Sequence, residues 1–111
     1  VGEVVAVEIG QDEARAQAAV AKAPDSVHAR QGLGRLLCQA DRPDEAIPHF
    51  LAALDRDPDN VELLCDLATA YTRTGQPERA DPLAERLRRL APQHPRVQEL
   101  LERLKPALSP R

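Results

Sequence analysis

Three histidines and two cysteines are the side chains of this 111-residue chain best suited to metal binding or nucleophilic catalysis. His28, His49 and His94 lack the i, i+4 spacing that places two metal ligands on one helical face. Neither Cys38 nor Cys65 has a neighbouring base or oxyanion site that would activate a thiolate. There is also no glycine-rich loop to hold a phosphate. We therefore expect no catalytic residue, no metal site and no cofactor, which means that the chain is not an enzyme.

The composition restricts the class of protein. The chain is 42% hydrophobic, 30% charged and only 2% aromatic, with a net charge of −3. No apolar run approaches the roughly 20 residues that a membrane span needs, so we expect no direct membrane insertion. The slight excess of acidic residues argues against nucleic-acid binding, which favours a basic surface. Leucine, alanine and valine must fill the core, and alanine and leucine are strong helix formers. This length and composition predict one all-α domain.

The prolines reveal an internal repeat. Several of the ten recur at intervals of 34 residues: Pro24, Pro58 and Pro92; Pro43 and Pro77; Pro48 and Pro82. Chance does not readily place prolines at three matched sets of positions. A fixed period of this length is typical of helical repeat proteins.

Each unit, residues 27–60 and residues 61–94, has the pattern helix, turn, helix. Ser26 and Asn60 are the expected N-caps of the first helices. The expected turns are residues 40–42 and 74–76. A proline opens each second helix, where its missing N–H costs nothing, and another ends it by restricting the residue before it. Pro48 and Pro82 fall inside second helices, which predicts a late helix start or a small kink there. The apolar positions expected to face inward are Val27, Leu33, Leu36, Leu37, Ala46, Ile47, Phe50, Ala53, Leu54, Val61, Leu64, Leu67, Ala68, Tyr71, Ala80, Leu83, Ala84, Leu87 and Leu90.

The flanks are expected to be partial units. Residues 11–24 form a helix with Ala14, Ala18 and Ala21 on its inner face. Residues 95–105 form a C-terminal capping helix with an otherwise polar surface, and residues 106–111 form a tail, because Pro106 and Pro110 prevent further helix. Residues 1–10 fit no helical face. They are either disordered or an extension in which Val4, Val5, Val7 and Ile9 cover the open end or dock a second copy. The apolar positions of the capping helix are Val97, Leu100, Leu101 and Leu104.

With this unit, the chain resembles the tetratricopeptide repeat family. The resemblance covers residues 27–94 in full and extends into partial units on both sides. Its pattern of a Leu-Gly pair, small residues at helix crossings and a final proline is matched by Leu33, Gly34, Ala46, Phe50, Ala53, Pro58, Leu67, Ala68, Tyr71, Ala80, Ala84 and Pro92. Departures include Leu37 in place of the usual aromatic residue and Leu87 in place of a small one. The resemblance implies an α-solenoid of antiparallel helix pairs, wound as a right-handed superhelix.

In this family the first helix of each repeat lines a concave groove that holds a peptide or helix of a partner. Carried over by position, the candidate groove residues are His28, Gln31, Arg35, Cys38, Gln39, Glu62, Cys65, Thr69, Thr72, Arg73, Arg96, Glu99 and Arg103. The arginines suit carboxylates or carbonyl groups, which favours an acidic or C-terminal peptide. The alternative is that each arginine only solvates its helix.

One subset of the family binds the C-terminal carboxylate of heat-shock chaperones through a Lys/Asn/Asn/Lys/Arg set. The corresponding residues here are Gln31, Arg35, Asp66, Arg96 and Leu100. Both asparagines are absent and Asp66 would repel a carboxylate, so we do not expect that function.

The sequence therefore predicts a non-catalytic scaffold for protein–protein interaction that binds a protein or peptide partner. The alternative is a regulatory or assembly domain of a larger bacterial protein, enzymatic or of the cell envelope, that forms a homodimer through its ends. A bacterial source is expected because arginine and alanine are abundant. A cytoplasmic location is expected, or a periplasmic one if a signal or preceding domain has been removed.

Overall fold

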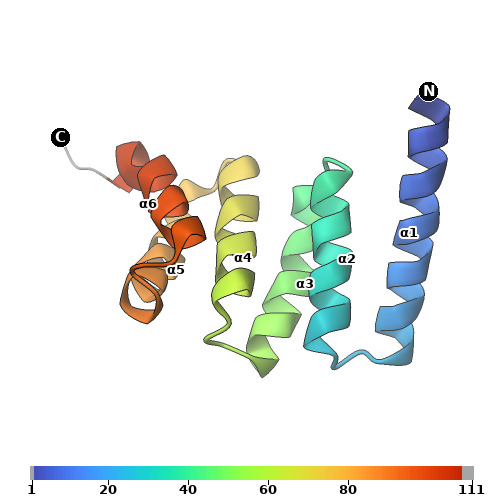
Figure 1. The fold of residues 1–111 in the computed structure, drawn as a ribbon, viewed down its shortest axis with the longest axis horizontal. Helices are drawn as coiled ribbons and strands as arrows, with labels where there is room; N and C mark the ends of the chain where they lie inside the picture. The colour runs from blue at the N-terminus through green and yellow to red at the C-terminus, as the bar shows by residue number, and fades with distance from the viewer. Residues whose placement is uncertain (1, 109–111) are drawn as a thin grey trace. The chain divides into compact units, whose positions relative to one another are not determined.

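The computed structural model describes the backbone of residues 2–108 and the side chains of residues 11–104. All the regular elements in this range are α helices (Figure 1): α1 (Gly2–Lys22), α2 (Val27–Gln39), α3 (Pro43–Arg56), α4 (Val61–Arg73), α5 (Pro77–Leu90) and α6 (Pro95–Leu108). They form two compact units, Val1–Pro58 with α1 to α3 and Asp59–Arg111 with α4 to α6. The all-α class expected from the composition is confirmed.

In the first unit, α2 and α3 form an antiparallel pair (Figure 1). Ser26 caps α2, since its hydroxyl accepts a hydrogen bond from the Ala29 N–H at 3.1 Å. The helices approach closely at Gly34, where a Cβ atom would lie 2.5 Å from Cε1 of the fully buried Phe50. Only glycine leaves room for this ring. The pairing of the two helices therefore depends on the small residue in the Leu-Gly pattern.

The turn between α2 and α3 also holds α1. Arg42 donates hydrogen bonds to both carboxylate oxygens of Glu13 on α1, at 2.8 and 3.1 Å, and to Glu45 on α3, at 2.7 and 2.8 Å. The hydrogen bond from Arg42 lowers the pKa of Glu45. Asp41 in the same turn has a φ of 62°, a left-handed conformation that aspartate tolerates better than most residues. One arginine thus joins all three helices of the unit.

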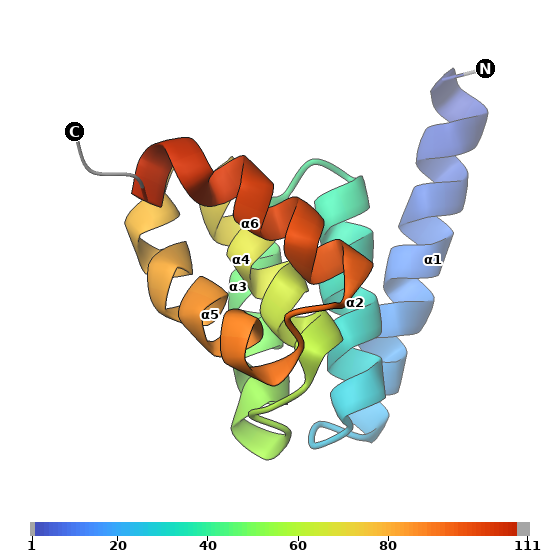
Figure 2. The ribbon, with the colours of Figure 1, turned by 60° about the vertical axis from the view of Figure 1, so that its left-hand side comes forward.

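The second unit repeats the helix pair and adds α6. Asn60 caps α4 by accepting the Leu63 N–H at 3.0 Å, and Gly75 has a φ of 77° in the turn that leads to α5. At the equivalent positions of the second unit, both residues of the close contact are alanines. Ala68 stands one repeat after Gly34 and Ala84 one repeat after Phe50, and both are fully buried. Helix α6 packs against both α4 and α5 (Figure 2).

Most residues predicted to form the core are buried. The buried members of the repeat pattern are Leu33, Gly34, Ala46, Phe50, Ala53, Leu67, Ala68, Tyr71, Ala80 and Ala84. Pro58 and Pro92 are exposed and follow the ends of α3 and α5, as expected for helix-ending prolines. Leu90 is an exception, because 42% of its surface is exposed and the prediction that it faces inward is wrong.

The internal prolines do not delay the helices. Helices α3 and α5 begin at Pro43 and Pro77 and continue through Pro48 and Pro82. Each internal proline lies in the second turn of its helix, so it removes one backbone hydrogen bond while its fixed φ still suits a helix. The predicted late helix start is wrong, and a small kink stays a prediction.

The two terminal helices are longer than the sequence suggested. Helix α1 begins at Gly2, ahead of the expected helix start at residue 11; the proposed covering role of residues 1–10 concerns side chains outside the described ones. Helix α6 continues to Leu108, past the expected end at residue 105, because a proline near a helix end removes only one backbone hydrogen bond. Residues 109–111 of the predicted tail lie outside the described residues.

The inner face of α1 also differs from the prediction. Ala14, Ala18 and Ala21 are exposed, and Ala16 and Val20 are among the residues that are half-buried instead. An alanine-rich helix has small residues on several faces, so its periodicity does not determine which face packs.

Candidate functional site

Helices α4 and α6 of the second unit position the candidate site. Helical spacing of three and four residues aligns Thr69, Thr72 and Arg73 along α4, and Arg96, Glu99 and Arg103 along α6. These side chains border two adjoining hollows. The first, of about 130 Å³, is lined by Cys65, Thr69, Arg96, Glu99, Leu100 and Arg103. The second, of about 100 Å³, is lined by Thr69, Thr72, Arg73, Leu100, Arg103 and Leu104. We call the two together the α4/α6 groove.

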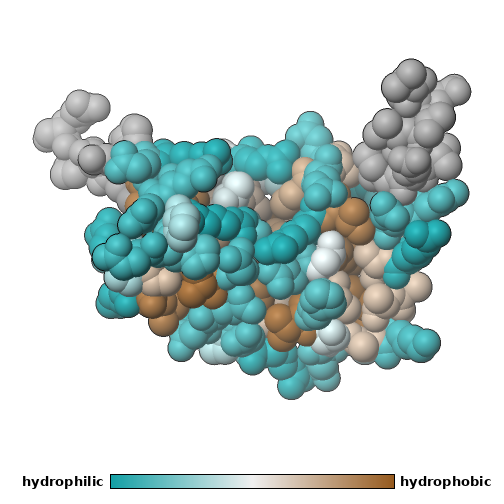
Figure 3. All heavy atoms as spheres, viewed as in Figure 1, coloured by the Kyte–Doolittle hydropathy of each residue, from teal (hydrophilic) through white to brown (hydrophobic). Residues whose placement is uncertain are grey.

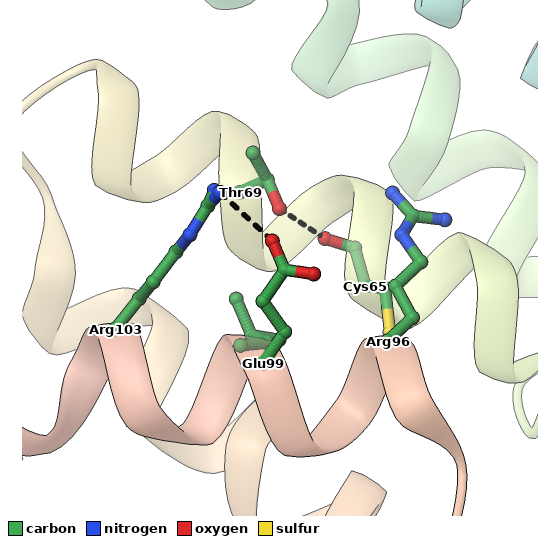
Figure 4. Close-up of a pocket in the computed structure, with 6 residues that line it drawn as sticks. Cys65, Thr69, Arg96, Glu99 and Arg103 are labelled. Carbon is green, nitrogen blue, oxygen red and sulfur yellow. Dashed lines mark hydrogen bonds and ion pairs between the residues drawn. The ribbon is translucent and has the colours of Figure 1, made fainter.

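The groove has an apolar floor and polar walls. The floor is formed by buried Cys65, Leu100 and Leu104. On one wall, Glu99 and Arg103 point toward each other and form an ion pair of 2.8 Å (Figure 4). On the other, the Thr69 hydroxyl donates to the Cys65 carbonyl at 2.8 Å (Figure 4), which leaves its oxygen able to accept from a ligand. The groove therefore combines apolar contact with hydrogen-bonding groups.

Arg96 has a structural role at the end of the groove. It donates to Asp66 at 2.5 Å and to Glu62 at 2.6 Å, both on α4. Burial alone would lower the pKa of Arg96, but the hydrogen bonds to Asp66 and Glu62 raise it. Asp66 is only 7% exposed, and a buried carboxylate of this kind requires a charged partner. Arg96 supplies that partner and joins α6 to α4.

His94 supports the same contact. Its Nδ1 accepts the Arg96 N–H at 3.1 Å in the first turn of α6, and its Nε2 lies 3.2 Å from the Glu62 carboxylate. A neutral ring with its proton on Nε2 satisfies both contacts. His94 therefore helps to cap α6 and is not arranged as a metal ligand.

Cys65 is a structural thiol. It is 1% exposed, and burial raises its pKa to about 11, so it remains protonated at neutral pH. A protonated thiol is a poor nucleophile. Among the described residues there is no group of three or more His, Cys, Asp or Glu side chains that would hold a metal ion.

The candidates on α2 belong to the first unit and are described separately. His28, Arg35 and Gln39 are exposed, while Gln31 and Cys38 are half-buried. None of them lines the hollow of about 330 Å³ that this unit contains. That hollow was not predicted and is lined by Gln17, Val20, Ala21, Leu33, Leu37, Arg42, Glu45 and His49. Seven of the predicted residues thus meet at the α4/α6 groove, and as binding residues all of them stay a prediction.

Comparison with known proteins identifies the family. Two models of the tetratricopeptide repeat match, one over residues 39–104 and the other over residues 12–61. The chain belongs to the tetratricopeptide repeat family. A search of the curated proteins gave no match.

Among solved structures, the chain is similar to a mutant of MamA, with a TM-score of 0.78, 20% identity and 95% of this chain covered. A second MamA structure, MamA MSR-1, has the same TM-score, 19% identity and the same coverage of this chain. The matched regions are 61% and 60% of those chains, so this chain spans less than two thirds of their length. Together with the family match, this likeness shows an all-α helical repeat solenoid.

Tetratricopeptide repeats support a protein-interaction scaffold in general, and the family is typically non-catalytic. Within the described residues, no helix is both long and apolar enough to cross a bilayer.

The sequence predicts Asp66 only as a residue that would repel a carboxylate, and not as the buried partner of Arg96. A signal for it was present, because Glu62 and Arg96 carry opposite charges at positions one repeat apart, and Asp66 follows Glu62 by one helical turn.

Proposed function

We propose that this tetratricopeptide repeat chain is a non-catalytic interaction module whose α4/α6 groove binds a short peptide segment of a partner protein. The observation that carries the proposal is the pair of adjoining hollows between α4 and α6, with a leucine floor and threonine and arginine walls. Apolar pockets with a few convergent polar groups are typical of ligand sites. Two hollows side by side suit two side chains that lie two residues apart in an extended segment, because alternate side chains point to the same face.

A residue shared by both hollows provides the test. Thr69 is half-buried and borders each of them, so Thr69→Phe places a ring where the peptide would lie. Glu78→Phe is the matched control, because Glu78 is exposed on α5 and borders neither hollow. Random nine-residue peptides displayed on phage would be selected on the wild-type chain, and their affinities measured by isothermal titration calorimetry.

We expect selected peptides to bind Thr69→Phe at least tenfold more weakly than wild type and to bind Glu78→Phe unchanged. Circular dichroism and thermal unfolding establish that both variants fold. Selection of no peptide, or equal binding by folded Thr69→Phe, would overturn the proposal.

Self-association is the second candidate function, and one observation favours it. Figure 3 shows apolar atoms gathered over α1 and α2, and Ala14, Ala18 and Ala21 are exposed on α1. Small apolar residues allow the close approach of a second helix. Light scattering over a range of concentrations tests this candidate: dimers that disappear in Ala18→Glu would support it, and a monomer at all concentrations would refute it.

A further inference from the structure

The two arginines beside the first hollow differ in their partners. Arg96 forms an ion pair with buried Asp66 on α4, which makes it part of the packing between α4 and α6. The Arg96 side chain is 37% exposed. Among the described residues, Arg103 is paired with Glu99, one turn earlier on the same helix, and the two side chains are 67% and 63% exposed. Exposed pairs at this spacing contribute little to stability, so an incoming carboxylate can replace Glu99 at low cost.

The charged residues that line the second hollow are both basic. Arg73 and Arg103 both line it, and no carboxylate is among its lining residues. Thr69 and Thr72 add hydroxyl groups, and Leu100 and Leu104 form the floor. Both hydroxyls donate to backbone carbonyls of α4, so their oxygens remain able to accept a hydrogen bond from a peptide N–H. A carboxylate is the charge complement of the Arg103 guanidinium group, which binds it through paired hydrogen bonds.

Resting on the proposed peptide-binding function, we propose that the α4/α6 groove selects a peptide in which an acidic residue and an apolar residue lie two positions apart. The apolar side chain lies on the floor formed by Leu100 and Leu104, and the carboxylate binds Arg103. Glu99 occupies Arg103 in the unbound chain and acts as an internal competitor. Asp66 does not repel this ligand, because Arg96 neutralises it.

The internal competitor can be tested with a matched pair of variants. Glu99→Gln removes the carboxylate that pairs with Arg103, and Glu102→Gln makes the same change in net charge at an exposed position of α6 that lines neither hollow. Arg103→Gln removes the binding group itself. The probes are the peptides selected by phage display, each synthesised with its acidic residue as Glu and as Gln.

We expect the Glu form to bind wild type about tenfold more tightly than the Gln form, as one charge-assisted hydrogen-bonded pair provides. Arg103→Gln should remove this preference. Glu99→Gln should strengthen binding of the Glu form about twofold, while Glu102→Gln should change it less.

Each other outcome has a defined meaning. Selected peptides that bind without preference for Glu over Gln would overturn this inference and leave the proposed peptide-binding function intact. Equal effects of Glu99→Gln and Glu102→Gln would refute internal competition. Failure to select any peptide would overturn both proposals together.

Discussion

The two glycines of α2 should respond in opposite directions to the same substitution. A Cβ atom at Gly32 meets nothing within 4 Å, whereas one at Gly34 would lie 2.5, 2.8 and 2.9 Å from three ring atoms of Phe50. Carbon atoms in contact normally lie about 3.5–4.0 Å apart. Phe50 is fully buried, so its ring can retreat only by displacing other core side chains.

The magnitudes follow from two contributions. Glycine to alanine inside a helix stabilises it by about 0.8–1.0 kcal/mol, and this gain applies at both positions. At Gly34 it is opposed by overpacking, which costs about 1–3 kcal/mol. We therefore expect Gly32→Ala to be more stable than Gly34→Ala by about 1–3 kcal/mol, because the helix-propensity gain cancels in the comparison.

Urea unfolding followed by circular dichroism measures this difference directly. The double variant Gly34→Ala, Phe50→Leu should lose less stability than the two single variants summed, since the smaller side chain relieves the clash. Equal stability of the Gly32 and Gly34 variants would refute the close approach of α2 and α3 at this point.

Three further predictions concern stability, measured by urea unfolding. Gly75→Ala should destabilise by about 1 kcal/mol, because alanine resists the left-handed conformation, and Gly75→Asn should cost less. Asp66→Asn should destabilise by about 1–2 kcal/mol, since it leaves half-buried Arg96 with Glu62 as its remaining charged partner. Burial, and then Arg30, lower the pKa of His49 from 6.5, so the folded state binds its proton less readily than the unfolded state does. Stability should therefore decrease as the pH falls below about 6.5, and His49→Gln should weaken that dependence.

The local rules of helix capping correctly predicted where α2 and α4 begin. Ser26 and Asn60 cap α2 and α4 as expected, because an N-cap depends on only a few neighbouring residues. The inner face of α1 was not predictable in this way. The side chain of Glu13 on that helix is fixed by Arg42, which lies 29 residues later in the chain. A local periodicity contains no information about such a partner.

The arginines of the candidate site illustrate the same difference. The sequence alone does not distinguish Arg73, Arg96 and Arg103, because each is predicted to be an exposed basic residue on a first helix. Packing separates them, because the partner of Arg96 is the buried Asp66, 30 residues away, whereas Arg103 pairs with its own helix. The sequence predicts that arginines line the candidate groove. It does not predict which of them is already paired with a buried carboxylate.

The different partners of Arg96 and Arg103 affect how the groove is maintained. Helix α6 supplies one wall of both hollows, and Arg96 holds its N-terminal end against α4 through Asp66 and Glu62. Loss of that contact changes both the stability of the unit and the shape of the groove. In the proposed groove, loss of the exposed Arg103 would remove the group that binds the carboxylate, with little effect on folding. We therefore expect stability and peptide affinity to be coupled at Arg96 and independent at Arg103, although the two residues lie only two helical turns apart on one face of α6.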